Sequence, residues 1–231
     1  MSAALAPPPA SSPPPAPAAR PRLLMTRAEF EAADACPGTR VEWLGATDET
    51  RDGEPLGLVW PRFGFDPDGS YAMANARHRE IVANLMLAVG GRIDRDVWEL
   101  ATQDAEVGCP TGRIRFPDVV LIRRPAEHAP NPGRTERVIT NAAVCVETLS
   151  DSTERVDHGD KPADYLSIPT VTDYLVIAQR ERCVWHRRRS AADGPPAWDV
   201  TRLDAPDAAV SLADPALTIP LAEIYARVTF D

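Results

Sequence analysis

The sequence predicts an α/β fold in which α-helices flank a central mixed β-sheet. Two apolar runs, Val119–Ile122 and 142–149, are typical of strands that are buried on both faces. Segments with helical spacing lie around these runs, so helices and strands alternate loosely along the chain. Hydrophobic residues make up 44% and charged residues 26% of the 231 positions, as in ordinary globular proteins.

The chain begins with a segment that cannot form a packed core. Residues 1–22 contain eight prolines and seven alanines, so we expect a disordered tail followed by one domain over residues 23–231. Thr26 and Glu29 have the spacing of a capping box, which predicts a short helix through Asp34.

Three segments follow before the centre of the chain. Residues 40–44 predict a short strand that contains Glu42. The segment 45–70 is rich in Gly, Asp and Pro and predicts a hairpin or an irregular loop. A helix is expected over 75–89, because an apolar stripe recurs there with helical spacing. The stripe comprises Val82, Leu85, Met86 and Val89.

The second half of the chain is richer in strands. Residues 160–168 predict a helix with Pro162 in its first turn, and 221–227 predict a last helical turn. Segments 174–177 and 183–186 are expected to pair as a hairpin. The expected strands are 97–100, 113–122, 142–149, 174–177, 183–186 and 198–203.

Composition excludes several classes of protein. No run approaches the ~18 apolar residues of a transmembrane helix, so we expect no membrane association. The four cysteines form no CxxC pair, which argues against a zinc ribbon and favours a reduced, cytoplasmic protein. The net charge of −9 argues against a generally basic nucleic-acid binder but leaves room for a local basic groove.

Lysine and arginine together number 25, and Lys161 is the only lysine among them. Abundant Ala, Arg and Pro indicate a compositional bias that replaces lysine wherever arginine will serve. A lysine that survives this bias either does something that arginine cannot do or has escaped by chance. Composition alone leaves both interpretations open.

Two acidic residues adjoin the strands that are expected to be buried. Asp118 directly precedes Val119–Ile122, and Glu147 follows Val144–Val146. A carboxylate beside a buried strand costs free energy unless it is paired or binds a cation. Two such carboxylates on neighbouring strands are typical of a Mg²⁺ or Mn²⁺ site, because these ions prefer oxygen ligands. The alternative for each is a strand end that faces solvent or pairs with arginine.

Several stretches resemble one family, in the order in which that family carries them. Pro117-Asp118 followed by Glu147 resembles the PD-(D/E)xK nuclease pattern. More closely, the sequence resembles the Uma-type family of bacterial restriction endonucleases over residues 24–228. The matching stretches are Thr26–Phe30, Arg40–Leu44, His78–Val82, Arg115–Val119, Val146–Thr153, Asp157–Tyr165 and Asp173–Val176.

The resemblance implies a restriction-endonuclease-like core and a metal-dependent nuclease domain. Asp118 and Glu147 would bind Mg²⁺ or Mn²⁺ and, with a lysine, hydrolyse a phosphodiester bond. The strict pattern places that lysine two residues after the second acid, where this chain has Leu149. The resemblance implies that Lys161 on the next helix takes this role. Glu42 would complete the metal shell or position the lysine; an exposed strand glutamate is the alternative.

Other residues admit two interpretations each. His78, at the start of a helix, would contact a phosphate or would lie on the surface. Arg187–Arg189, with Arg180 and Arg182, would bind a phosphate backbone or would form a solvated hairpin end, and we favour the second. Tyr165 is expected in the core.

The expected function is that of a hydrolase, a Mg²⁺-dependent endonuclease that acts on DNA. The first alternative is a catalytically silent module that binds nucleic acid or protein, and the second is a phosphodiesterase for small substrates. Analogy with the nuclease superfamily suggests a homodimer. If Lys161 is catalytic, Lys161→Arg should abolish most cleavage and leave thermal stability nearly unchanged.

Overall fold

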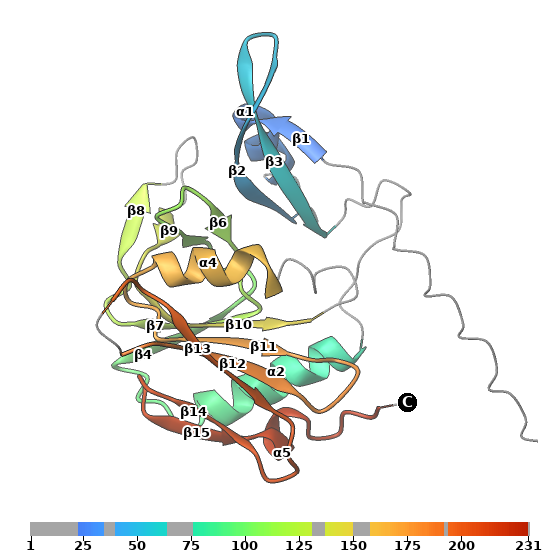
Figure 1. Cartoon of the computed structure of the whole chain (residues 1–231), viewed down its shortest axis with the longest axis vertical. Coiled ribbons are helices and arrows are strands. Elements are labelled where there is room, and N and C mark those ends of the chain that lie inside the picture. Colours follow the sequence, from blue (N-terminus) through green and yellow to red (C-terminus); the bar gives the residue numbers. More distant parts are fainter. Residues whose placement is uncertain are drawn as a thin grey trace, which may run out of the picture.

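A six-stranded mixed sheet forms the centre of the protein in the computed structural model, which describes residues 23–34, 40–63, 76–130, 137–149, 158–191 and 194–230. Strands β10 and β11 run parallel, and the other neighbouring pairs are antiparallel. The predicted mixed sheet is therefore confirmed (Figure 1). In spatial order the strands are β13 (Trp198–Leu203), β12 (Val184–Arg189), β11 (Asp173–Ile177), β10 (Ala142–Thr148), β7 (Val119–Arg123) and β4 (Trp98–Thr102).

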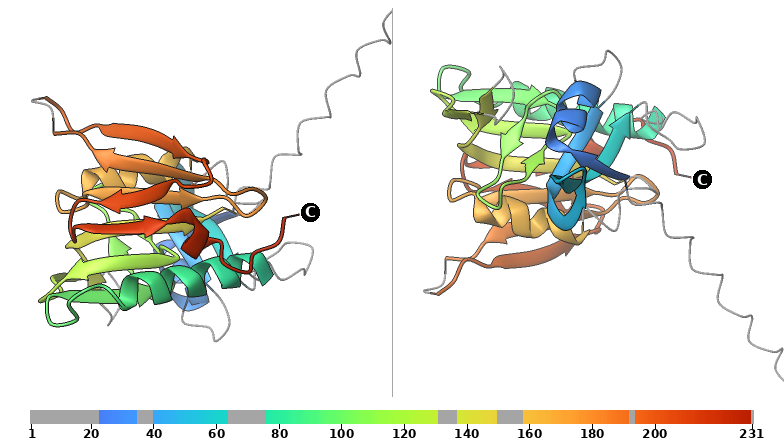
Figure 2. Two further views of the ribbon diagram at one scale, coloured as in Figure 1. Left: turned by 90° about the horizontal axis from the view of Figure 1, so that it is seen from below. Right: turned by 90° about the horizontal axis from the view of Figure 1, so that it is seen from above.

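One face of this sheet packs against helix α2 (Ala76–Gly90). The helix buries Leu85 and its apolar neighbours against alternate residues of β7 and β10, such as Leu121 and Val144. Short helix α5 (Leu221–Ile224) and a two-stranded hairpin complete this layer, as Figure 2 shows from two sides. The hairpin consists of β14 (Ala209–Leu212) and β15 (Leu217–Pro220).

The opposite face packs against helix α4 (Asp160–Ser167) and a small four-stranded sheet (Figure 1). Because side chains alternate along a strand, Val120 and Cys145 point to α4 while their neighbours point to α2. Strands β7 and β10 are thus buried on both faces, as predicted. The small sheet has the order β6 (Ile114–Arg115), β5 (Val107–Gly108), β9 (Arg137–Ile139) and β8 (His128–Pro130).

The N-terminal part forms a separate three-stranded antiparallel sheet with helix α1 (Arg27–Asp34). The predicted capping box is present, because Glu29 accepts a hydrogen bond from the Thr26 amide at 2.8 Å and donates its own amide to the Thr26 hydroxyl at 3.2 Å. The predicted hairpin is also present, and its two-residue turn, Asp52-Gly53, has positive φ at both positions. The strands are β1 (Leu23–Thr26), β2 (Arg40–Arg51) and β3 (Glu54–Phe63).

The structure differs from the prediction around residues 113–122, which form two strands instead of one. Ile114–Arg115 belongs to the small sheet and Val119–Arg123 to the large one. Pro117 lies between them and lacks the amide that a strand ladder needs. The break sends the chain from one layer to the next, immediately before Asp118.

The predicted tail, residues 1–22, lies outside the described residues. Among the helices that the structure does describe, we find none with the length and apolarity to span a membrane.

Candidate active site

Asp118 and Glu147 lie side by side on adjacent strands. Val119 on β7 is opposite Val146 on β10 in antiparallel register, which places Asp118 opposite Glu147 and on the same face. Both residues are buried, with exposed fractions of 4% and 1%. The structure therefore brings together the two carboxylates that the sequence singles out, on the face that α4 covers.

Helix α4 brings two side chains to Glu147. The ammonium of Lys161 lies 2.9 Å from Oε1 of Glu147, and the Tyr165 hydroxyl donates a hydrogen bond to the same oxygen at 2.8 Å. Positions four apart on a helix share one face, so one face of α4 presents both groups together. The lysine side chain points to Glu147 and is itself 1% exposed.

Tyr165 is buried as predicted, but its hydrogen bond to Glu147 is a feature that sequence reasoning missed. The available signal was the four-residue spacing from Lys161, which places the two residues on one helix face. Cys145, two residues before Glu147, is a buried thiol whose pKa is raised well above the ordinary value by burial. A neutral thiol is a poor nucleophile, so this cysteine fits packing and not covalent chemistry.

A buried ion-pair cluster fixes α4 in place. Asp164 accepts hydrogen bonds from Arg115 at 2.8 Å, from Arg113 at 3.2 Å and from the Thr111 hydroxyl at 3.0 Å. Arg115 and Asp164 are 0% and 1% exposed. Since Arg115 stands three residues before Asp118, one short segment both supplies a carboxylate and anchors the helix that carries Lys161.

Asp118 is held from two sides. Its Oδ2 accepts the Thr148 amide at 2.7 Å, and Nε2 of His78 lies 3.5 Å from Oδ1. The other ring nitrogen of His78 is 3.4 Å from Nε2 of Gln179, which also donates to the Leu149 carbonyl. The structure thus places His78 against a carboxylate, and its predicted phosphate contact stays a prediction.

The sequence carries the family assignment. A sequence model of the Uma2 family, described as "Putative restriction endonuclease", matches residues 67–221. The chain belongs to the Uma2 family. Among solved structures, one described as a putative nuclease of DUF820 from Anabaena variabilis superimposes with a TM-score of 0.61 at 14% identity, and the match covers 89% of this chain and 99% of that one. At this identity the likeness shows the fold alone, and a search of curated proteins finds no match.

The Uma2 match begins at residue 67, after the N-terminal hairpin. Glu42 lies on β2 of that hairpin, where its backbone is opposite Trp60. The side chain of Glu42 is outside the described part of the structure, so its predicted role at the metal or the lysine stays a prediction.

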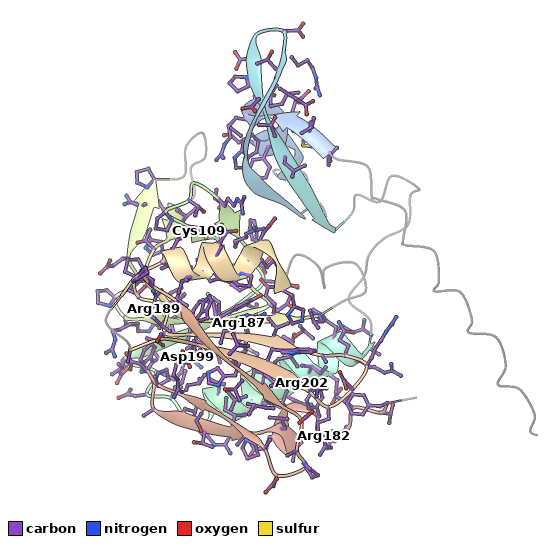
Figure 3. The ribbon with its side chains drawn as sticks, viewed as in Figure 1. Cys109, Arg182, Arg187, Arg189, Asp199 and Arg202 are labelled. Carbon is purple, nitrogen blue, oxygen red and sulfur yellow. The ribbon has the colours of Figure 1, made fainter. Side chains whose placement is uncertain are left out.

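The structure contradicts the sequence interpretation of the arginines on β12. We favoured a solvated hairpin end for Arg187–Arg189, yet Arg187 is buried and 8% exposed. Arg189 donates to the carbonyl oxygens of Val171 and Leu166 at 2.7 and 2.8 Å, and so joins β12 to the last turn of α4 and to the loop after it. The cause is that β12 lies inside the sheet, between β11 and β13 (Figure 3).

The carboxylates of this Uma2 protein fit a hydrated Mg²⁺ or Mn²⁺ ion. Asp118 and Glu147 offer oxygen donors, and Mg²⁺ is commonly held by one or two carboxylates while it keeps several waters. No group of three His, Cys, Asp or Glu side chains suited to a metal occurs within the described ranges. Two carboxylates suit a hard ion better than a zinc ion, which favours nitrogen and sulfur ligands.

Proposed function

We propose that the protein is a Mg²⁺- or Mn²⁺-dependent endonuclease that hydrolyses phosphodiester bonds of DNA. The observation that carries the proposal is the buried pair of carboxylates, Asp118 and Glu147, with the Lys161 ammonium 2.9 Å from one of them. Burying two adjacent carboxylates and an ammonium costs free energy, and a structural core gains little from them. Such a cost is typical of functional sites.

Asp118 and Glu147 would hold the metal ion. When bound, a divalent ion supplies positive charge that polarises a phosphoryl oxygen and makes water more acidic. The hydrogen bond from Thr148 orients Asp118, and Tyr165 orients Glu147. These contacts limit the motion of the two carboxylates, which favours one fixed metal position.

Lys161 contributes a second positive charge. Hydrolysis adds the oxygen of water to phosphorus and breaks the bond from phosphorus to one sugar oxygen; one proton of the water ends on the released sugar hydroxyl. Negative charge grows on the phosphoryl oxygens as the bonds exchange. An ammonium that is already in place stabilises this charge without reorganisation. Its contact with Glu147 sets that position.

The experiment is cleavage of supercoiled plasmid with Mg²⁺, Mn²⁺ or EDTA. We expect nicked and linear products with either metal and none with EDTA. Asp118→Ala and Glu147→Gln should lose activity, whereas Asp207→Ala, a substitution in an exposed turn, should keep it. Equal cleavage by Asp118→Ala would overturn the proposal and indicate a contaminating nuclease.

Parallel reactions separate the alternatives. The same enzyme is incubated with single-stranded RNA and with bis(p-nitrophenyl) phosphate, a small phosphodiester. Faster turnover of RNA or of the small ester than of plasmid would replace DNA as the substrate class. Binding of plasmid without cleavage under every metal condition would favour the catalytically silent module.

A further inference from the structure

Strand β13 forms one edge of the large sheet. It pairs with β12 over its whole length, and no described strand pairs with its other side. Figure 2 shows the β12–β13 pair at the margin of the molecule in both views. The four central residues, 199–202, are exposed. An edge of this length offers unpaired backbone groups to another strand.

The hydrogen-bond alternation shows which residues face outward. The Ser190 amide donates to the Ala197 carbonyl at 2.9 Å, and these two residues are opposite each other in the β12–β13 register. In an antiparallel pair every second residue directs both its backbone groups to the partner. The amides and carbonyls of Trp198, Val200 and Arg202 therefore point away from β12, to the open edge.

The same three residues carry their side chains on the face covered by α4. The Trp198 indole donates to the Pro162 carbonyl at 2.8 Å, and the Arg202 guanidinium lies 6.0 Å from the centre of the Trp185 ring. Between them Val200 is 57% exposed, which makes it one of few large apolar side chains on the described surface. An aromatic, an aliphatic and a cationic side chain thus follow one another along the edge. Figure 3 labels Arg202, the cationic residue of the three.

We infer that β13 pairs antiparallel with β13 of a second copy of this chain, about a two-fold axis at Val200. This register places Trp198 opposite Arg202 of the second copy, twice, and Val200 opposite its own equivalent. A guanidinium over an indole ring is attractive, and paired valines bury their exposed methyl groups. The outward backbone groups of the three residues then form about six hydrogen bonds.

Other symmetric registers are worse matched. An axis at Asp199 opposes two carboxylates, and an axis at Arg202 opposes two guanidinium groups. An axis at Thr201 places Val200 against Arg202 and Asp199 against Leu203. Of these four registers, the one with its axis at Val200 alone pairs each side chain with a compatible one, since Asp199 then faces the hydroxyl of Thr201. Charge and shape therefore select this register.

The pairing joins the two six-stranded sheets into one continuous sheet. A two-fold axis perpendicular to a sheet keeps each face on the same side, so both α4 helices lie on one face of the dimer. Both sets of Asp118, Glu147 and Lys161 are then on that face as well. The inference does not depend on the proposed nuclease activity.

Sedimentation velocity of the full chain over a concentration series tests the dimer. The molecular mass obtained for the wild-type protein should be twice that of the monomer. Val200→Lys places two ammonium groups across the axis and should weaken dimerisation about tenfold. Thr201→Lys, the matched control, places its lysine opposite Asp199 of the second copy and should remain dimeric. Because both positions are exposed in the monomer, neither variant should change the melting temperature of the monomer.

Three results would overturn the inference. They are a wild-type monomer at every concentration, a Val200→Lys variant that dimerises as well as wild type, and a Thr201→Lys variant that dissociates as readily as Val200→Lys. The first result would show that no dimer forms. The other two would show that β13 is not the interface or that it does not pair in this register.

Cross-linking checks the register directly, in a background where Cys36 is replaced by serine. Residues opposite each other in a hydrogen-bonded pair have Cα atoms about 5.5 Å apart, within reach of a disulfide. Val200→Cys should therefore form a covalent dimer with diamide as oxidant. Thr201→Cys places its two Cα atoms about 8 Å apart, beyond the reach of a disulfide, and should not cross-link. Equal cross-linking of both variants, or cross-linking of Thr201→Cys alone, would refute the register.

Discussion

The Lys161 ammonium lies 2.9 Å from Oε1 of Glu147, although the two residues stand on different elements. Leu149 occupies the position where the strict PD-(D/E)xK pattern would place the lysine, and it is buried on the same strand face. Helix α4 crosses above this face, so a lysine in its first turn reaches the carboxylate from the opposite direction. Lys161 therefore places its charge beside this carboxylate from a different element, as expected if the lysine of the strict pattern has moved to α4.

Lys161→Arg should lower metal-dependent cleavage about 100-fold, because a displacement of ~1 Å near the reacting phosphate is costly. From sequence alone we expected no loss of stability. The burial of Lys161 changes that part, since a larger guanidinium must displace packed neighbours, at about 1–3 kcal/mol. Cleavage is measured well below the melting temperature of the variant.

Lys161→Met supplies the comparison for this prediction, because it keeps the length of the side chain and removes the charge. Lys161→Met should lose as much metal-dependent cleavage as Lys161→Arg. An arginine variant with wild-type cleavage would end the assignment of Lys161 to the reaction.

Tyr165→Phe removes one hydrogen bond to Glu147 and leaves the ring in place. A carboxylate that loses a buried donor costs about 1–3 kcal/mol, so urea unfolding should show a loss in that range. We also expect the concentration of Mg²⁺ at half-maximal cleavage to rise about tenfold, because outer contacts tune metal affinity. A variant with lower stability and an unchanged Mg²⁺ requirement would show that the hydroxyl is only structural.

Breaking the Arg115–Asp164 pair should destabilise the fold strongly. Arg115→Met leaves the buried Asp164 carboxylate with Arg113 and Thr111 as its remaining partners among the described residues, and we expect a loss of about 3–5 kcal/mol in urea unfolding. The double variant Arg115→Met/Asp164→Leu should recover part of this loss, since it removes the unpaired charge. A double variant less stable than Arg115→Met would contradict this account.

The strong local patterns made much of the fold predictable. The apolar runs of β7 and β10 and the stripe of α2 indicate burial without any knowledge of partners. The split between Ile114–Arg115 and β7 was not predictable, because a two-residue strand is defined by its distant partner and not by its own sequence. Hairpin β14–β15 was missed because each of its strands has only four residues, too few to show a clear alternation of apolar and polar side chains.

The candidate site, like the fold, was only partly predictable from the sequence. Asp118, Glu147 and Lys161 are conspicuous in the sequence, since charge beside buried strands is rare and lysine is unique here. The contacts that position them are not conspicuous, because Arg115 and Asp164 are 49 residues apart and either would pass for a surface residue. Sequence therefore predicts the reactive groups better than the groups that hold them.

Arg182 should contribute to DNA binding if the proposed function holds. It is exposed in the turn after β11, three residues beyond Gln179, which contacts His78 beside Asp118 (Figure 3). Arg182→Glu should weaken DNA binding and reduce the slope of log affinity against log salt by about 1. Arg95→Glu, an exposed change beyond the other end of α2, is the control and should change neither. Equal effects of both variants would indicate a general charge effect.

Asp173 should make folding stability depend on pH in acid. Burial raises the pKa of this carboxyl, but hydrogen bonds from His186 at 2.6 Å, from the Ala213 amide and from Thr172 outweigh it, so the pKa is lowered overall. A group with a depressed folded-state pKa contributes stability that is present above its unfolded pKa, about 3.9, and is lost as pH falls toward the folded value. Asp173→Asn lacks this contribution at every pH.

The difference in unfolding free energy between wild type and Asp173→Asn, measured in urea from pH 5 downward, should therefore shrink as pH falls through about 4. Asp207→Asn, in an exposed turn, should stay within about 0.5 kcal/mol of wild type over the same series. A difference for Asp173→Asn that stays constant or grows toward low pH would show that its contacts do not favour the ionised carboxyl.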